Sequence, residues 1–379
     1  MANNIRIFFA GDFCSTPSTG PIKVSDELMS TINSCQLKLC NFEVPLRPDF
    51  DLPHQSRRRF YQHDDVPDFL RSIGFNLFPL ATNHAFDWDD YGYAKTKERL
   101  GDAAFGVGTY DEVHKAKIVE VNGIKIGFIA VCFAAYKGVF TNVENHSGLG
   151  CAYINDLKLP HSIMQAKEKV DYLIVMPHDG IEYVDIPTPE TIARYRDFID
   201  WGADAVIGTH PHCPQGWEKY SNGVIFYSLG NFFFNSMQDY SYRALNRPHW
   251  YEGLGVILQL DTASRAISFE IVNTRNIDNL AITIDNSIER EKHNALLCSY
   301  LSDKSEYDKC YSTQIEKIVE NEYLPKLYSV TPPLKQAAGT LLKAIYAKLR
   351  KPSCRIPNGI KRMIEHDRMR ESLLRYLNK

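Results

Sequence analysis

The sequence has no pair of cysteines in a C-x-x-C spacing, and its nine cysteines are an odd number. Structural zinc sites and the disulfide frameworks of small secreted domains depend on paired cysteines, so neither is indicated. Several thiols stand inside apolar runs, as Cys132 does in GFIAVCF. We therefore expect reduced, mostly buried cysteines, which are typical of a cytosolic protein.

Long hydrophobic runs are also missing from the sequence. No stretch of about 18 apolar residues occurs, so no transmembrane helix is predicted. The first residues, MANNIRIFFAGDF, enter a strand-like run without the basic segment, apolar core and cleavage site of a signal peptide. These features favour a cytoplasmic location.

Neither sign of charge dominates the chain as a whole. The formal net charge is −3, which gives no argument for nucleic-acid binding. The charge is unevenly distributed, because residues 281–379 hold 18 Lys and Arg against 12 Asp and Glu. The segment 332–351 also has an amphipathic helical pattern. We expect the basic C-terminal helices either to pack on the main domain or to contact the inner membrane surface or a protein complex.

What the sequence does contain is a series of short, β-rich apolar runs separated by helical segments. Two of the helical segments, 64–74 and 188–202, are amphipathic, and Asn122-Gly123 marks a hairpin turn within 117–131. The runs predict strands over 5–12, 37–43, 75–84, 117–131, 171–180, 204–212, 224–232, 255–261 and 266–272. This alternation predicts an α/β layered fold with mixed sheets.

The pattern changes near residue 280, where strands stop and helical patterns take over. We therefore predict one domain over residues 1–280 and a helical, basic C-terminal region over 281–379. The expected helices cover 287–301, 306–323, 334–350 and 358–377.

Polar side chains follow most of the predicted strands at the point where each strand ends. In open α/β sheets, ligands bind beside the carboxyl ends of the strands. Taken singly, most of these residues are more easily explained by a turn, a helix cap or a loop hydrogen bond, and the His210–His212 pair is the stronger signal. The set consists of Asp12, Asn41, Glu43, Asn83, His84, His178, His210, His212 and Asn231. Its repetition at successive strand ends favours a metal site.

The donor set indicates which metals are suitable. Carboxylates, amides and imidazoles suit one or two divalent ions such as Mn²⁺, Fe²⁺, Zn²⁺ or Mg²⁺. A pair of such ions activates a water molecule and stabilises both ends of a phosphoryl displacement. In GTHPH we expect an extended backbone, which would place His210 and His212 on one side, with Pro211 stiffening the segment.

Six motifs occur in order along the chain. They are GD (11–12), NFE (41–43), TNHAFDW (82–88), HDGIEY (178–183), GADAVIGTHPH (202–212) and YSLGNFFF (227–234). Together they resemble the CapA family of poly-γ-glutamate capsule synthesis proteins. That family is similar to the calcineurin-like metallophosphoesterases, so the resemblance implies a layered α/β/β/α sandwich over roughly residues 4–275.

The resemblance also implies roles for individual residues. His84 matches a catalytic histidine, and Glu43 matches a carboxylate that bridges metals. Asn231 matches a residue that shapes the site. The metal ligands implied in this way are Asp12, Glu43, Asn83, His178, His210 and His212. At the first motif Cys14 stands where phosphoesterases carry a histidine, either as a soft ligand or, as we expect, as a packed thiol.

Further residues are expected around the centre. Glu182 and Tyr183 are placed to line the site, with Glu182 orienting His178 as an alternative. The basic run Arg57, Arg58 and Arg59 either attracts an anionic substrate or is a solvated loop.

The function implied is a metal-dependent, phosphoesterase-like hydrolase acting in poly-γ-glutamate or related capsule polymer biosynthesis. The alternative is a non-hydrolytic metal-binding component of a capsule synthesis or export complex. In the first case we expect an anionic small molecule or polymer as substrate.

Overall fold

The structure is a computed structural model of the chain. It describes residues 4–16, 21–50, 60–134, 138–141, 147–235, 248–323, 370–372 and 374–375. The chain forms two compact units, the first made of Met1–Phe133 and Lys137–Asp303, the second of Ala134–Tyr136 and Lys304–Lys379. The candidate metal centre lies in the first unit.

The first sheet of this unit is built around β1 (Asn4–Cys14). Two neighbours, β3 (Leu37–Phe42) and β15 (Asn231–Phe234), run parallel to β1, and β16 (Glu252–Asp261) runs antiparallel. The sheet is therefore mixed, as predicted. It is completed by β17 (Ile267–Ile277), β18 (Ala281–Ile284) and β2 (Lys23–Val24).

The second sheet has a parallel centre formed by β8 (Ile124–Cys132), β11 (Tyr172–His178), β12 (Ala205–Ile207) and β14 (Gly223–Phe226). Its further strands are β13 (Trp217–Tyr220), β10 (Gly150–Tyr153), β6 (Val107–Gly108), β7 (Lys117–Val121) and β9 (Val139–Phe140). A separate pair is formed by β4 (Phe78–Pro79) and β5 (Ala104–Phe105).

The predicted hairpin is confirmed by β7 and β8. Its two turn residues, Asn122 and Gly123, have φ angles of 53° and 79°, as a type I′ turn requires.

Alternation along β1 explains how the two sheets come to pack face to face. Successive side chains of a strand point to opposite faces. The ring of Phe9 lies 6.4 Å from that of Phe128 in the second sheet, whereas the ring of Phe8 lies 6.1 Å from that of Phe75 on the helical side. A second contact between the sheets joins Phe226 and Phe269 at 5.1 Å.

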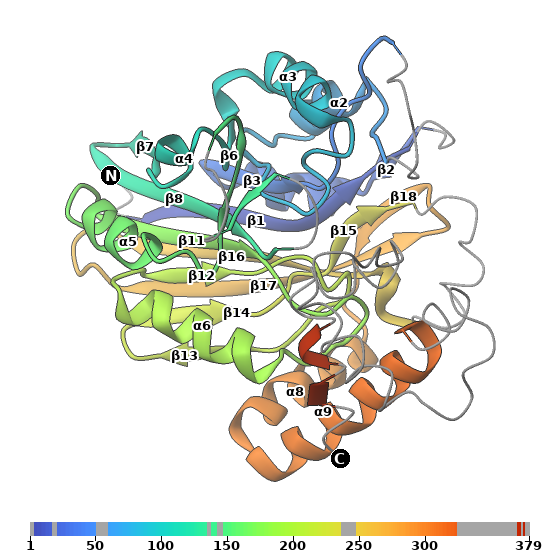
Figure 1. Cartoon of the computed structure of the whole chain (residues 1–379). Helices are drawn as coiled ribbons and strands as arrows, with labels where there is room; N and C mark the ends of the chain where they lie inside the picture. The colour runs from blue at the N-terminus through green and yellow to red at the C-terminus, as the bar shows by residue number, and fades with distance from the viewer. Residues whose placement is uncertain are drawn as a thin grey trace, which may run out of the picture. The chain divides into compact units, whose positions relative to one another are not determined.

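Helices cover the outer face of each sheet. On the side of β1, Ile32 of α1 (Asp26–Asn33) and Leu70 of α2 (Val66–Ser72) pack in one buried cluster with Phe8. On the other side, Tyr195 of α6 (Pro189–Asp200) stacks on Tyr227 at 5.5 Å. Figure 1 shows α2 and α3 (Asp89–Leu100) beside the sheet of β1, and α5 (Leu159–Lys167) and α6 beside the sheet of β11. This layering confirms the predicted fold class.

Shorter helices complete the first unit. They are η1 (Gly101–Ala103), α4 (Tyr110–Val113) and η2 (Pro248–Tyr251). The start of α6 follows the predicted pattern, because Thr188 Oγ1 accepts a hydrogen bond from the Thr191 N–H and Pro189 is the first helical residue.

The C-terminal helices are described in part. The first unit ends with α8 (Ile288–Ser302), and the second unit contains α9 (Lys304–Ile318) and a π-helical turn, η3 (Val319–Tyr323). These segments match two of the four predicted helices. The helices expected at 334–350 and 358–377 lie outside the described residues, apart from helical residues at 370–372 and 374–375. The predicted division after residue 280 stays a prediction.

The described part of the chain agrees with the expectations about membrane-spanning helices and about the cysteines. No helix there is long and apolar enough to cross a lipid bilayer. The eight cysteines described are free thiols, six of them buried.

Candidate metal centre

The centre begins with the register of three parallel strands. The pairing of β1 with its parallel neighbours sets Asp12 opposite Asn41 of β3 and opposite Asn231 of β15. All three side chains are buried. Asp12 and Asn41 lie near the ends of their strands, whereas Asn231, which was expected at the end of a strand, is the first residue of β15. The register of the three strands brings positions 12, 41 and 231 together.

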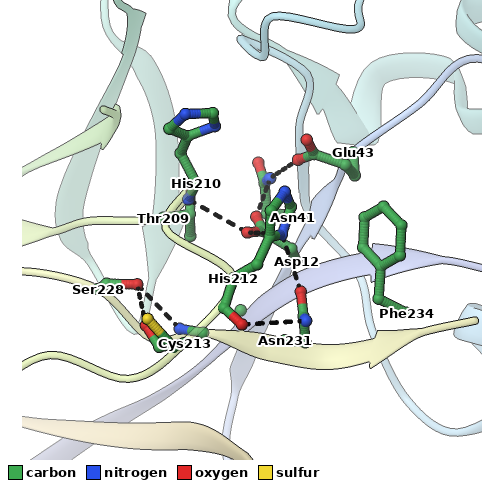
Figure 2. A network of polar contacts seen from close by, with 12 residues as sticks. Asp12, Asn41, Glu43, Thr209, His210, His212, Cys213, Ser228, Asn231 and Phe234 are labelled. Atoms are coloured by element: carbon green, nitrogen blue, oxygen red, sulfur yellow. Dashed lines mark hydrogen bonds and ion pairs between the residues drawn. The ribbon is translucent and has the colours of Figure 1, made fainter. Parts of the chain in front are cut away.

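Hydrogen bonds hold the two buried carboxylates of the centre near each other. Asn41 Nδ2 donates to Asp12 Oδ1 at 2.6 Å and to Glu43 Oε2 at 3.0 Å. Figure 2 shows the Asn41 amide between these two carboxylates. Thr82 Oγ1 donates to the Glu43 backbone carbonyl at 2.7 Å, which fixes the segment that carries the glutamate.

The first candidate triad consists of Asp12, Glu43 and His178. Each offers one ligand atom, and these atoms lie within 4.8 Å of one another. His178 Nε2 is 3.4 Å from Glu43 Oε1, and its Nδ1 is 4.0 Å from Asp12 Oδ1. The other partner of Nδ1 is Thr209 Oγ1, at 3.0 Å. A hydrogen bond at Nδ1 leaves Nε2 as the ring atom available to a cation.

The surroundings of His178 Nε2 fit a bound cation. Asn83 Oδ1 lies 2.8 Å from this nitrogen, and with Glu43 Oε1 it brings two acceptor oxygens to the same point. Glu43 Oε1 is buried, and no hydrogen bond to it is found among the described residues.

The charges in this triad lead to the same conclusion. Asp12 and Glu43 are fully buried, and in the described part of the chain their ion-pair partners are histidines, not Lys or Arg. Burying two carboxylates without strong cationic partners costs several kcal/mol per ion, and a divalent ion removes that cost.

The second candidate triad consists of Glu182, His210 and His212. Their ligand atoms also lie within 4.8 Å of one another. The ring centroids of His178 and His210 are 4.8 Å apart, and His212 Nδ1 is 3.3 Å from Asp12 Oδ2. The two triads are therefore adjacent, with Asp12 of the first beside His212 of the second.

The backbone of the His-Pro-His segment differs from the expected extended form. His210 has a φ of 104° and His212 a φ of 57°, both in a region that residues other than glycine rarely adopt. The His210 N–H donates to Asp12 Oδ2 at 3.1 Å, which helps to hold this conformation. Strained backbone of this kind gathers at functional sites.

Glycine makes the strand end before this segment possible. A Cβ atom on Gly208 would lie 2.2 Å from the Tyr227 carbonyl oxygen, so the two chains approach more closely than any other residue permits. The close approach leads the chain directly into Thr209 and His210.

His212 is held by its neighbours on both sides. Its Nδ1 lies 3.0 Å from Asn231 Oδ1, and its ring packs against Trp250 at 5.2 Å and Phe234 at 4.9 Å. Burial opposes the charged forms of His212 and Asp12, but their mutual attraction raises the pKa of His212 and lowers the pKa of Asp12.

His84 stands beside the triads and pairs with a carboxylate. Its Nδ1 lies 2.8 Å from Asp87 Oδ2, and the ring of Phe60 meets it edge-on at 5.0 Å. Burial opposes the protonated imidazole, but Asp87 outweighs that effect and raises the pKa of His84 to about 9. His84 can therefore carry a proton at neutral pH.

Other predicted residues are placed as follows. Tyr183 lines the centre, with its ring centroid 6.3 Å from that of His212, and its N–H donates to the Pro211 carbonyl at 2.7 Å. Cys14 is a packed thiol in a cluster with Val44 and Trp250, and burial raises its pKa well above the ordinary value. Arg57, Arg58 and Arg59 lie outside the described residues.

Two contributing residues were not predicted from the sequence. Thr209 holds His178, and Asp87 pairs with His84. The sequence places Asp87 three residues after His84, a spacing that brings side chains together in a helical turn. No comparable local pattern links Thr209 to His178, because their contact depends on the pairing of separate strands.

The fold and the centre together define a class of protein, an α/β sandwich with a candidate two-metal site at the ends of its strands. Residues 7–236 match the family described as bacterial capsule synthesis protein PGA_cap. The match covers more than half of the chain, and the chain belongs to this family. The resemblance inferred from the six motifs is thereby confirmed.

Curated relatives support the same assignment. The capsule biosynthesis protein CapA of Bacillus anthracis is 31% identical over 174 residues, which are 44% of this chain and 42% of the relative. The PGA biosynthesis protein CapA of Bacillus subtilis (strain 168) is 33% identical over 201 residues, 52% of each protein. The chain thus spans about half the length of the curated relatives it matches.

Among solved structures, a hypothetical protein from Thermus thermophilus is similar at 18% identity, with 71% of this chain and 99% of that chain covered. The TM-score is 0.43, which carries no functional argument.

Proposed function

We propose that the protein is a metal-dependent hydrolase of the phosphoesterase type that acts in the biosynthesis of poly-γ-glutamate or a related capsule polymer. The observation that carries this proposal is the adjacency of two ligand triads, Asp12–Glu43–His178 and Glu182–His210–His212. The names of the two curated relatives supply the biological setting.

The two triads would each hold one divalent ion, with Asn83 adding its Oδ1 to the first. Mn²⁺, Fe²⁺ and Zn²⁺ suit the mixed nitrogen and oxygen donors, and Mg²⁺ suits the first triad best because it offers more oxygen. When bound, such ions activate water and stabilise the charge that develops on a phosphoryl or carbonyl oxygen.

The remaining residues would orient ligands and transfer a proton. The Nδ1 atoms of His178 and His212 lie within hydrogen-bond distance of Thr209 Oγ1 and Asn231 Oδ1, respectively. These contacts would fix the orientation of both rings. His84, protonated and paired with Asp87, would donate a proton to the departing oxygen of an anionic substrate.

Turnover by metal-stripped protein tests the proposal. The full chain is stripped with a chelator, supplied with Mn²⁺, and assayed on bis(p-nitrophenyl) phosphate and on a γ-glutamyl peptide. We expect metal-dependent hydrolysis of one of these, abolished by Glu43→Gln and unchanged by His161→Ala, since His161 is an exposed residue of α5 outside both triads.

The contrary result is also informative. If the protein retains stoichiometric metal and cleaves neither compound, the hydrolase proposal fails, and a non-hydrolytic metal-binding role in a synthesis or export complex takes its place.

A further inference from the structure

A second group of ligand-type side chains lies outside the centre described above. Asp185 comes from the loop after β11, His249 from η2, and His293 from α8. Each offers one ligand atom, and the three atoms lie within 4.8 Å of one another. None of the three belongs to either triad of the main centre. We call this group the α8 cluster.

The two imidazoles of the α8 cluster are aligned in the same direction. Their ring centroids are 4.0 Å apart and their planes differ by 22°. Both Nδ1 atoms lie near Glu252 Oε2, at 3.1 Å for His249 and 3.3 Å for His293, and His293 Nδ1 is also 3.3 Å from Arg290 Nη1. Both Nε2 atoms face Asp185 Oδ2, at 3.9 Å and 3.8 Å respectively.

The separations on the two sides of the rings differ in kind. The Nδ1 distances to Glu252 are those of hydrogen bonds or close to them, whereas the Nε2 distances to Asp185 are too long for hydrogen bonds. Ligand atoms about 2.0–2.2 Å from a common zinc-like ion lie at separations only slightly shorter than these. The distances between the Nε2 atoms and Asp185 therefore suit a bound ion, whereas the distances between the Nδ1 atoms and Glu252 suit hydrogen bonds.

Glu252 has the position of a supporting carboxylate. Histidines that bind metals usually donate their other ring N–H to a carboxylate, which fixes the tautomer and the ring orientation. Here one carboxylate serves both rings, and it is itself paired with Arg290, whose side chain is 1% exposed. Arg290 and His293 stand three residues apart on α8, so the helix supplies a ligand and the support for its orientation.

An ion-pair cluster without a metal explains the arrangement less well. If both stacked imidazoles were protonated, they and Arg290 would bring three positive charges against two carboxylates. If only one were protonated, the charges would balance, but its Nε2 would lie 3.8 or 3.9 Å from Asp185 Oδ2, beyond the distance of a hydrogen bond. If both were neutral with their Nδ1 protons toward Glu252, two Nε2 lone pairs would face the Asp185 carboxylate with no proton between them. A divalent ion satisfies the last of these arrangements.

We propose that Asp185, His249 and His293 bind one divalent transition-metal ion of the Zn²⁺ or Co²⁺ type, with Glu252 orienting both imidazoles. Two imidazoles and one carboxylate favour such ions over Mg²⁺ or Ca²⁺. This inference does not rest on the proposed hydrolase function.

An ion bound at the α8 cluster would also affect the main centre, because the segments that carry two of its ligands contact that centre. Asp185 follows Glu182 by three residues in the same loop, and His249 precedes Trp250, whose ring packs on His212. An ion at the α8 cluster joins this loop and η2 to α8. It therefore restrains two segments that contact the main centre.

Crystals of the full chain soaked in Co²⁺ provide the direct test. We expect an anomalous difference peak about 2.0–2.2 Å from His249 Nε2, His293 Nε2 and a carboxylate oxygen of Asp185. A wild-type map without this peak overturns the proposal. Peaks at the main centre are judged separately, so failure at one site is distinguished from failure at the other.

Isothermal titration calorimetry with Co²⁺ tests the same proposal in solution. We expect His293→Ala to bind one equivalent fewer than wild type, and His161→Ala, which removes an exposed imidazole from α5, to bind as many as wild type. Equal stoichiometry for wild type and His293→Ala contradicts the proposal. If His293→Ala does not fold, the anomalous difference map of the wild-type crystals decides whether the ion binds at the α8 cluster.

Discussion

At the scale of single residues, the centre depends on side chains that orient other side chains. Asp12, Glu43 and the histidines are the ligand candidates, and the sequence identified them because each follows an apolar strand. Thr209 and Asp87 fix the directions of His178 and His84. Thr209 could not be assigned from the sequence, because its contact with His178 joins separate strands and leaves no local pattern. Asp87 stands three residues after His84, which was a usable local signal.

Thr209→Val should weaken metal binding, because it removes the hydroxyl that lies 3.0 Å from His178 Nδ1. Loss of a group that orients a ligand reduces metal affinity by about 10–100-fold. The measurement is calorimetric titration of the metal-stripped protein with Mn²⁺. Thr209→Ser keeps the hydroxyl and should bind like wild type, and an unchanged affinity in Thr209→Val would refute the assigned role.

His84→Ala should lower kcat by about 10²–10⁴-fold, the range for loss of a general acid, while metal content stays unchanged. Asp87→Asn should cause a smaller loss of kcat, because the imidazole remains but its 2.8 Å partner carries no charge. Steady-state kinetics with parallel metal analysis distinguishes the two effects. Full kcat in His84→Ala would remove this residue from the mechanism.

At the scale of elements, apolar periodicity predicted most of the long strands. The run 224–232, expected as one strand, forms β14 and β15 of different sheets, and the run 75–84 contains only the short strand β4. The hairpin of β7 and β8 and the cap of α6 were predicted because their turn and cap residues are local signals. The positive φ angles of His210 and His212 were not, since an extended segment was expected and the contact with Asp12 overrides the local preference.

The pairing of β1 with β3 contains a further irregularity. The register shifts between Ala10 and Asp12, so Gly11 is the extra residue of a bulge. A Cβ atom on Gly11 would lie 1.9 Å from the Gly230 carbonyl oxygen. The glycine therefore lets the loop before β15 approach the strand end that carries Asp12.

Gly11→Ala should destabilise the fold on the order of 1–3 kcal/mol, as overpacking of a close contact does. The backbone at Gly230 must move to relieve the clash, which also displaces Asn231 from Asp12. Urea unfolding followed by circular dichroism measures the change in the free energy of unfolding. An unfolding midpoint equal to that of wild type would show that the bulge tolerates a side chain.

At the scale of the whole molecule, the sequence predicted a layered α/β protein of the capsule synthesis family, and the structure and the family match confirm it. The α8 cluster was not predicted, because its residues come from three distant segments with no shared motif. Two triads at the ends of strands from both sheets form the candidate centre, and the proposed function depends on the metal that they would hold.

Metal analysis of wild-type protein purified without chelators tests the central claim most directly. Inductively coupled plasma mass spectrometry should find stoichiometric Mn, Fe or Zn in wild type and in His161→Ala. Glu43→Gln and His210→Ala should each show less metal, because each removes a ligand from one triad. Wild-type protein without bound metal, or equal metal content in all four proteins, would contradict the claim that these triads form a metal centre.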